Sequence, residues 1–346
     1  MPRCDMLDSH ACVKMDGIYA PCCVYDTSKN EKLSVEHSID DYLKSKSYKK
    51  IKTNMETDWD PGCLSCKYHE EKGVQSHRDR ANDSGLTGEY LEYVELSVSN
   101  ECNISCRSCN PTWSSKWESL LGKQEAKDFD LYKIFKNTDI SKLRLIKYLG
   151  GEPFITPQIN DLFSFLDEKK VLENVEFLTL TNCTYYPKKY EEVLNRFKKV
   201  NIAFSIDGFE KSNEYSRTGT NWSVMKDNML KWLSFRDQHH NMNCYIHTTV
   251  GAYNVHDYSK LKNFANQHSL ALSEFILQKP EYLTMNALPK DYVESIIDEN
   301  NKKFFKDYTF NNTLNNILIN KTNEMDVLLK QNIKEYIPNL AGYLNA

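Results

Sequence analysis

Long hydrophobic runs are missing from this 346-residue chain, and no stretch approaches the ~20 consecutive apolar residues that a membrane span needs. The start, Met1-Pro2-Arg3-Cys4-Asp5, lacks the basic-then-apolar pattern of an export signal. Lys and Arg form no long run, and the formal net charge is -4, so no obvious footprint for a polyanion is present. We therefore expect a cytoplasmic protein without membrane partners, and the charge disfavours a nucleic-acid partner.

Cysteine, in contrast, is plentiful, with 11 residues. Without an export signal, we expect these thiols to be metal ligands rather than disulfides. Three of them form Cys102-x3-Cys106-x2-Cys109, directly after the strand-like run 93–98. An iron–sulfur cluster normally has four cysteine ligands, so three would leave one iron open to a small molecule, as catalytic zinc sites keep one open position. A zinc site or a disulfide is the alternative that this spacing leaves open.

Apolar runs of strand length alternate with helical patterns between residues 91 and 278. The expected strands are 93–98, 143–149, 175–180, 200–206, 244–250 and 272–277. This alternation predicts an α/β fold with a parallel sheet, in which functional residues gather at the C-terminal ends of the strands.

The pattern divides the chain into three expected domains. A Cys-rich region covers residues 1–88, the β/α region covers 89–280, and a helical C-terminal extension covers 281–346. In the extension, Met325, Leu328, Leu329 and Ile333 fall on roughly one face of an expected helix.

Residues suited to ligand binding follow two of the expected strands. The run 143–149 continues into Gly150-Gly151-Glu152, and paired glycines let a backbone approach a ligand because no Cβ intrudes. An ordinary strand-to-helix turn is the alternative for this segment. The run 200–206 leads to Ser205 and Asp207, whose side chains point the same way because side chains alternate along a strand. A hydroxyl and a carboxylate together suit hydrogen bonds with vicinal hydroxyls.

A second group of cysteines precedes the β/α region. Cys4 and Cys22 are followed some forty residues later by Cys63 and Cys66, on a Pro-Gly turn. Four thiolates make a closed iron–sulfur cluster or a zinc site, and the sequence alone barely separates the two. Cys23 could replace Cys22 as a ligand.

Together these motifs resemble the radical S-adenosylmethionine (SAM) superfamily, because the three-cysteine loop, the Gly-Gly-Glu segment and the Ser205-x-Asp207-Gly208 strand end occur in the expected order. One departure is Ser108, where many members carry an aromatic residue. The resemblance implies a partial (β/α)6 TIM-like barrel in which Cys102, Cys106 and Cys109 hold a [4Fe-4S] cluster. SAM would chelate the open iron, and its reductive cleavage would yield a 5'-deoxyadenosyl radical that abstracts a hydrogen atom.

The resemblance also implies SAM contacts. Gly150, Gly151 and Glu152 would contact the amino group of SAM, and Arg217 its carboxylate. Ser205 and Asp207 would contact the ribose, and Val250 and Asn254 would flank the adenine. Thr181 and Asn182 would line the site. The N-terminal layout of Cys4, Gly17, Cys22, Cys63 and Cys66 resembles the twitch subdomain, a shortened relative of the SPASM domain. That module holds one auxiliary [4Fe-4S] cluster and usually follows the barrel, whereas here its cysteines precede it.

The leading hypothesis is therefore a radical SAM enzyme, an oxidoreductase or a peptide-modifying enzyme, reduced by a one-electron donor such as flavodoxin or ferredoxin. Twitch and SPASM relatives mostly modify peptides or protein side chains, which favours a peptide substrate. A dehydrogenase of a small metabolite or carbohydrate, with the auxiliary cluster as electron acceptor, is the second hypothesis. A non-enzymatic interaction scaffold stapled by zinc is the third.

Overall fold

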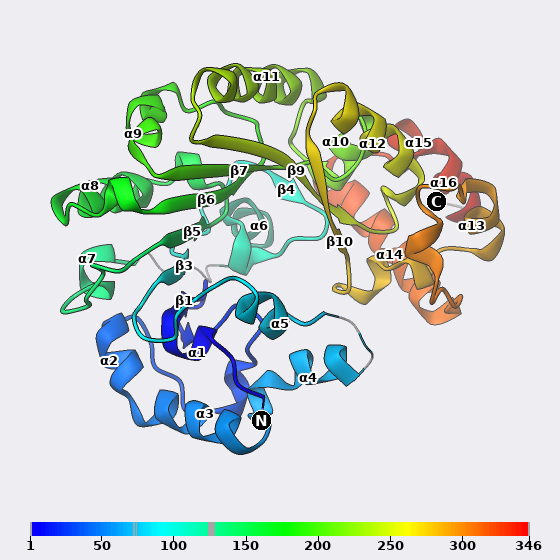
Figure 1. The fold of residues 1–346 in the computed structure, drawn as a ribbon. Coiled ribbons are helices and arrows are strands. Elements are labelled where there is room, and N and C mark those ends of the chain that lie inside the picture. The colour runs from blue at the N-terminus through cyan, green and yellow to red at the C-terminus, as the bar shows by residue number, and fades with distance from the viewer. Residues whose placement is uncertain (1, 72, 74, 124–128, 345–346) are drawn as a thin grey trace. The chain divides into compact units, whose positions relative to one another are not determined.

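The structure is a computed structural model, and it describes residues 2–71, 73, 75–123 and 129–344 (Figure 1). The chain divides into two compact units, each assembled from three stretches of sequence. Unit 1 contains Met1–Glu101, Gln124–Thr179 and Lys189–Val200, and unit 2 contains Cys102–Lys123, Leu180–Lys188 and Asn201–Ala346. The domain boundaries near residues 88 and 280 that the sequence suggests stay a prediction.

The fold is a mixed α/β structure with a mostly parallel sheet, as the sequence predicts. The strands of unit 1 are β1 (His10–Val13), β2 (Tyr19–Ala20), β3 (Tyr93–Ser97), β5 (Leu145–Leu149) and β6 (Glu176–Thr181), whose last two residues belong to unit 2. β1 pairs antiparallel with β2 and parallel with β3, and β5 pairs in parallel with both β3 and β6. β1 is not expected from the sequence, because four residues are too short to show a strand period.

Helices make up much of the rest of unit 1. They are α1 (Met6–Ser9), α2 (Ile39–Lys44), α3 (Lys46–Thr57), α4 (Leu64–Glu71), α5 (His77–Asn82), α7 (Leu131–Ile134), α8 (Gln158–Glu168) and α9 (Glu191–Arg196). α8 runs alongside β5 and β6 in Figure 1, and its Phe163 ring lies 5.4 Å from the ring of Phe177 in β6. Both α2 and α5 begin with a serine capping box, at Ser38 and Ser76, which satisfies backbone N–H groups at the first turn.

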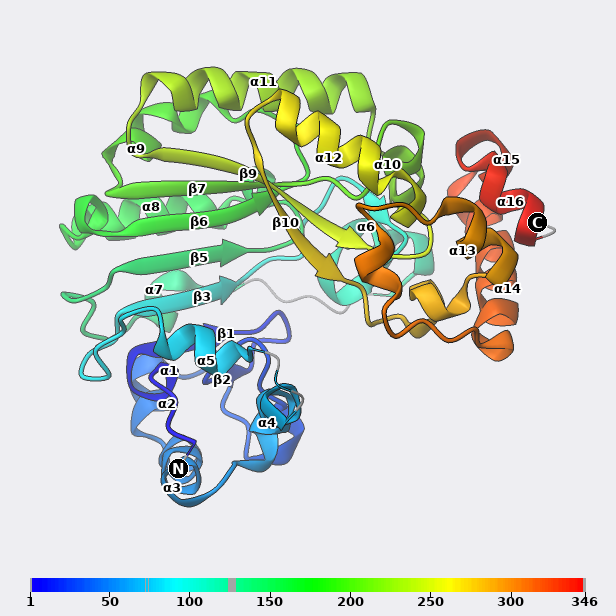
Figure 2. The same cartoon turned by 45° about the vertical axis from the view of Figure 1, so that its right-hand side comes forward.

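Unit 2 contains the remaining strands. They are β7 (Lys199–Ser205), whose first two residues belong to unit 1, β9 (Met242–Val250), β10 (Ala271–Ile276) and the short antiparallel pair β4 (Ser105–Cys106) and β8 (Arg217–Thr218). β9 and β10 pair in parallel, and Figure 2 shows α11 and α12 lying along them. All six strands expected from the sequence are therefore present, within two residues at each end.

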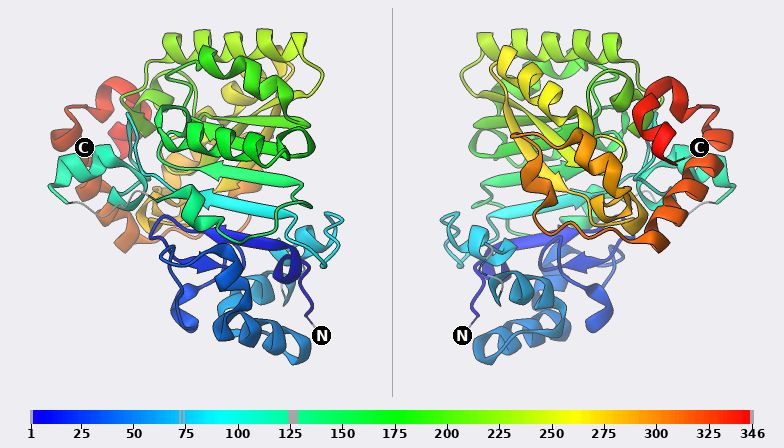
Figure 3. Two further views of the ribbon diagram at one scale, coloured as in Figure 1. Left: turned by 90° about the vertical axis from the view of Figure 1, so that its left-hand side faces the viewer. Right: turned by 90° about the vertical axis from the view of Figure 1, so that its right-hand side faces the viewer.

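The C-terminal part is helical, as expected. The helices of unit 2 are α6 (Ser115–Leu121), α10 (Lys211–Ser216), α11 (Trp222–Gln238), α12 (Tyr258–Gln267), α13 (Lys290–Ile296), α14 (Asn312–Leu329), α15 (Ile333–Tyr336) and α16 (Pro338–Leu344). The last four gather in one group (Figure 3). One expectation is wrong: Ile333 does not share a helix face with Met325 and Leu328. α14 ends at Leu329 because Lys330 adopts the left-handed conformation (φ 54°), and Ile333 begins α15.

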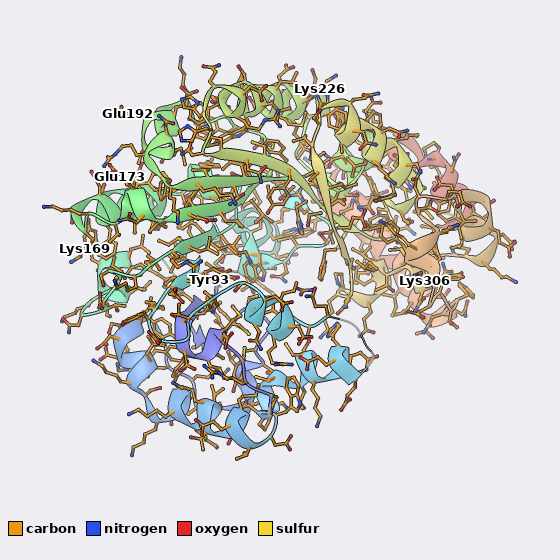
Figure 4. All side chains as sticks on the ribbon, in the orientation of Figure 1. Tyr93, Lys169, Glu173, Glu192, Lys226 and Lys306 are labelled. Carbon is orange, nitrogen blue, oxygen red and sulfur yellow. The ribbon has the colours of Figure 1, made fainter. Side chains whose placement is uncertain are left out.

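Charged side chains such as Lys169, Glu192 and Lys226 point outward from the helices (Figure 4). In the part of the chain that the structure describes, no helix is both long and apolar enough to cross a membrane.

Candidate active site

The three-cysteine loop lies in unit 2 and is held by backbone contacts. Cys106 belongs to β4 and pairs with Arg217 of β8. The carbonyl oxygen of Cys106 accepts hydrogen bonds from the backbone N–H of Cys109 at 3.0 Å and from Nε1 of Trp117 at 2.9 Å. The backbone N–H of Cys102 donates to Oγ of Ser115 at 3.0 Å. The loop conformation is thus fixed at all three cysteines by the protein itself.

The thiols of this loop are close enough to influence one another. Burial raises the pKa of Cys106 to about 12, the Arg217 guanidinium opposes that rise, and the thiols of Cys109 and Cys102 add to it. Burial also raises the pKa of Cys109 to about 11. Metals bind the thiolate, so metal binding here would release protons. A group of three thiols, one buried and two half-buried, fits an iron–sulfur donor set.

Among the described residues, no three Cys, His, Asp or Glu side chains are arranged to hold a single ion. Thiolates around one zinc, at about 2.3 Å from the metal, lie within about 4 Å of one another. In a four-iron cluster each cysteine binds a different iron, so its sulfurs lie farther apart.

Two of the residues expected to bind SAM form an ion pair in unit 2. Oδ2 of Asp207 accepts from Nη1 of Arg217 at 2.6 Å, and Oδ1 accepts from the backbone N–H of Thr249 at 2.7 Å. Asn254 donates to the carbonyl oxygens of Asp207 and Thr249. Nε of Arg217 is buried and has no hydrogen-bond partner within the described residues. A buried N–H without a partner is costly, and a carboxylate would satisfy it.

One other expected residue, Asn182, contacts the cysteine loop through its side chain. Thr181 ends β6, Asn182 follows it, and both are buried. Nδ2 of Asn182 donates to Oδ1 of Asn103, which lies between the first two cysteines, at 2.9 Å. Asn103 in turn donates to Thr184 at 2.7 Å. Ser205 ends β7 and is half-buried. The sequence analysis missed Asn103, although its place inside the cysteine spacing was a signal.

The Gly-Gly-Glu segment lies in unit 1 and packs against residues 99–101. The backbone N–H of Gly151 donates to Ser99 O at 3.0 Å, and that of Glu152 donates to Glu101 O at 2.7 Å. A Cβ on Gly151 would lie 2.3 Å from Glu101 O. The missing side chain therefore permits two backbone segments to approach each other.

Gly151→Ala is accordingly expected to lower the free energy of unfolding by about 1–3 kcal/mol, because backbone must move to admit the methyl group. Chemical denaturation of the apoprotein measures this. Gly342→Ala is the matched control, since a Cβ there meets nothing within 4 Å. Equal stability of the two variants would contradict the prediction.

The N-terminal cysteines lie in unit 1 and form one electrostatic group. Burial raises the pKa of Cys22, and the thiols of Cys23, Cys4 and Cys63 raise it further. Cys63 is influenced by Cys4 and Cys66 in the same way. Gly17 has φ 76° in the turn between β1 and β2, a conformation that favours glycine. The structure thus brings Cys4, Cys22, Cys63 and Cys66 together.

Cys23 faces a different environment. Its thiol interacts with Glu95 and Lys147, and its Sγ lies 3.8 Å from Nε2 of His77. Of the two adjacent cysteines, Cys22 is therefore the better candidate for the fourth ligand.

Arg107 is a residue that the sequence analysis missed. It lies between Cys106 and Ser108, is 1% exposed, and places its guanidinium 3.6 Å above the Tyr215 ring. Its Nη2 donates to Oδ1 of Asp326 at 2.5 Å and to Oε1 of Gln331 at 3.0 Å. The side chain thus anchors the cysteine loop to the end of α14. No local motif signals this contact, because Asp326 lies 219 residues away in sequence.

Comparisons with known proteins give partial matches, and no protein-family model matches the chain. The radical SAM cyclopropyl synthase TigE of Paramaledivibacter caminithermalis is 26% identical over 170 residues, 44% of this chain and 34% of that protein. The GTP 3',8-cyclase of Nautilia profundicola is 29% identical over 124 residues, 35% of this chain and 36% of that protein. The chain spans about a third of the length of these curated relatives.

Solved structures match more of the chain at lower identity. The anSMEcpe structure with bound AdoMet is 16% identical, with a TM-score of 0.44, covering 59% of this chain and 56% of that one. Streptococcus suis SuiB bound to precursor peptide SuiA is 13% identical, with a TM-score of 0.38, covering 92% of this chain and 70% of that one.

Proposed function

We propose that this chain is a radical SAM superfamily enzyme, as its partial match to a radical SAM cyclopropyl synthase supports, and that it reductively cleaves SAM at a [4Fe-4S] cluster held by Cys102, Cys106 and Cys109. One observation carries the proposal: β4 and β8 pair Cys106 with Arg217, which is itself paired with Asp207. The cysteine loop and the two SAM-binding candidates are therefore neighbours in one compact unit. When bound, the cluster and SAM supply a 5'-deoxyadenosyl radical that abstracts a hydrogen atom.

The protein's own residues hold the cofactor in this proposal. The unpartnered Nε of Arg217 donates to the SAM carboxylate, while Asp207 fixes the guanidinium from the other side. Ser205 and Asp207 lie near the ribose, and Asn254 fixes the backbone beside the adenine. Asn182 supports the cysteine loop through Asn103, and Thr181, the residue before it, is kept as a lining residue from the resemblance alone. The Gly150-Gly151-Glu152 segment is assigned to the SAM amino group from the resemblance of the motif alone.

An auxiliary [4Fe-4S] cluster in unit 1, bound by Cys4, Cys22, Cys63 and Cys66, is the second part of the proposal. The mutual influence of these thiols supports it. Cys22→Ala is expected to lose about four irons per chain after anaerobic reconstitution, because one ligand of a four-iron cluster is removed. Cys23→Ala is the matched control and should keep the parent's iron content. Loss of iron in Cys23→Ala alone would assign the ligand to Cys23.

We propose a peptide or protein side chain as substrate and a flavodoxin- or ferredoxin-type protein as electron donor. The twitch-like cysteine layout supports the peptide. Dehydrogenation of a small metabolite or carbohydrate is the second candidate for the same site. A cytoplasmic location follows from the proposed need for reduced thiols.

The proposal is tested on anaerobically purified, full-length protein reconstituted with iron and sulfide. About eight irons per chain are expected from two four-iron clusters, with 5'-deoxyadenosine formed when dithionite and SAM are added. Zinc in place of iron would support the scaffold hypothesis instead. Two clusters without cleavage of SAM would contradict the catalytic proposal.

A further inference from the structure

Strands β1, β3 and β5 of unit 1 have two unlike faces. One face is fully buried and almost entirely apolar, with 0% exposure at Ala11, Val13, Val94, Leu96, Ile146 and Tyr148. The opposite face carries polar groups in two rows that the strand register sets. His10 lies opposite Tyr93 in the first row, and Glu95 lies between Cys12 and Lys147 in the second.

An ion pair forms the centre of this polar face. Oε2 of Glu95 accepts from Nζ of Lys147 and from the hydroxyl of Tyr93, both at 3.2 Å. The Glu95 side chain is 4% exposed, whereas that of Lys147 is 25% exposed. Beside the pair, the thiol of Cys23 lies near His77. The pair is thus buried at the carboxylate and open at the ammonium group.

This arrangement is costly for a purely structural element. A buried ion pair adds little stability compared with apolar side chains of similar size, which fill the other face of the same strands. In addition, Nε2 of His10 is buried without a hydrogen-bond partner in the described chain, and its ring lies 4.2 Å from that of Tyr93. This atom is a polar position behind the strand face that no described residue satisfies.

A cavity adjoins the polar face. Its volume is about 300 Å³, at the lower end of the range for small-molecule sites. Tyr93 lines it together with His77 of α5, so the cavity shares Tyr93 with the polar face. Its other charged lining residues are Arg80, Arg144, Glu92 and Glu176. The two positive and two negative charges cancel, and Nη1 of Arg144 lies 3.3 Å from Oε1 of Glu92.

The charges of the polar face also cancel. Glu95 and Lys147 neutralise each other, and burial lowers the pKa of His10 to about 4, so that its imidazole is uncharged at neutral pH. A charged ligand would bring an uncompensated charge into a desolvated site. An uncharged ligand that both donates and accepts hydrogen bonds fits this site without adding a charge.

We propose that Glu95, Lys147 and Tyr93, with the adjoining cavity, bind an uncharged hydrogen-bonding part of the substrate; we name them the Glu95–Lys147 site. Calling the ligand a substrate rests on the proposed function. The chemistry of the site fits a neutral group with a donor and an acceptor, either a peptide amide or a sugar hydroxyl.

Two pools of neutral probes test the site on reconstituted full-length protein by affinity selection and mass spectrometry. One contains N-acetylated, C-amidated peptides of Gly, Ala, Ser, Asn and Gln, and the other contains uncharged mono- and disaccharides. We expect members of one pool to be retained by the parent protein. Retention should fall at least tenfold in the double variant Glu95→Gln/Lys147→Met. This variant removes both charges together, so that neither charge is left without its partner.

Matched variants separate the site from general damage. Lys290→Met/Glu294→Gln removes an exposed pair of the same type in unit 2, at 3.7 Å, and should retain the probes as the parent does. Tyr93→Phe removes a single hydroxyl and should weaken retention several-fold, which keeps the test decisive if the double variant does not fold. Iron content and the visible spectrum report whether each variant is assembled.

The outcomes distinguish the two ligand sources. Retained peptides identify the amide, and retained saccharides identify the hydroxyl. Retention of neither pool by the parent, or equal retention by parent and Tyr93→Phe and double variants, overturns the proposal. SAM cleavage is measured on the same preparations: if the parent fails to cleave SAM but the double variant loses probe retention, the proposed function fails and the binding site stands.

Discussion

Cys102→Ala is expected to abolish the formation of 5'-deoxyadenosine from SAM under reducing conditions. With only two thiolates left in the loop, the cluster that takes up SAM cannot be held, because a cubane with an open iron requires three cysteine ligands. Iron should fall from about eight to about four per chain, since the cysteines of unit 1 are untouched. The measurements are iron content and chromatographic detection of 5'-deoxyadenosine after addition of dithionite and SAM.

Cys244→Ala is the matched control for this variant. Cys244 is also a buried cysteine of unit 2, 4% exposed, but it lies on β9 and is not part of either cysteine group. It should retain the parent's iron and its SAM cleavage. Cleavage at the parent's rate in Cys102→Ala would show that the three-cysteine loop does not bind the catalytic cluster.

The sequence predicts the strands of this fold well because each is a short apolar run bounded by turns or helices. β7 is expected over 200–206 and found over Lys199–Ser205, β10 agrees as closely, and β9 begins two residues before its expected start. The short β1 was missed, and it matters because it brings Cys12 beside Glu95. The end of α14 was also missed, since a left-handed residue such as Lys330 leaves no mark in the apolar period.

The site residues stay a prediction, but the sequence did indicate residues that the structure places beside the cysteine loop. The cysteine spacing and the strand ends at Asp207 and Asn182 are local patterns, and the structure connects both strand ends to the cysteine loop. Contacts between distant segments were not predictable. The partner of Arg107 lies on α14, and the pairing of Asp207 with Arg217 could not be read from a strand-end motif.

Arg107→Met is expected to destabilise unit 2 by about 3–5 kcal/mol, because the Asp326 carboxylate loses its buried cationic partner. Arg107 is 1% exposed and Asp326 is 14% exposed, so solvent can compensate for little of the loss. The hydroxyl of Tyr215 donates to the same carboxylate at 2.8 Å, but it is neutral and cannot replace the guanidinium charge. Urea denaturation of the apoprotein measures the change in the free energy of unfolding.

The double variant Arg107→Met/Asp326→Leu decides whether the ion pair or the packing of Arg107 matters. With both charges removed, no uncompensated charge remains, and stability should return to within about 1–2 kcal/mol of the parent. If the double variant is as unstable as Arg107→Met, the loss comes from contacts other than the ion pair: the guanidinium stacked on Tyr215, or the hydrogen bonds that Asp326 accepts from the Tyr215 hydroxyl and the Ile333 backbone N–H. Recovery of stability without recovery of SAM cleavage would show that the bond between Arg107 and α14 also positions the cysteine loop. The C-terminal helices would then be part of the catalytic apparatus, because Asp326 and Gln331 both bind the residue that follows Cys106.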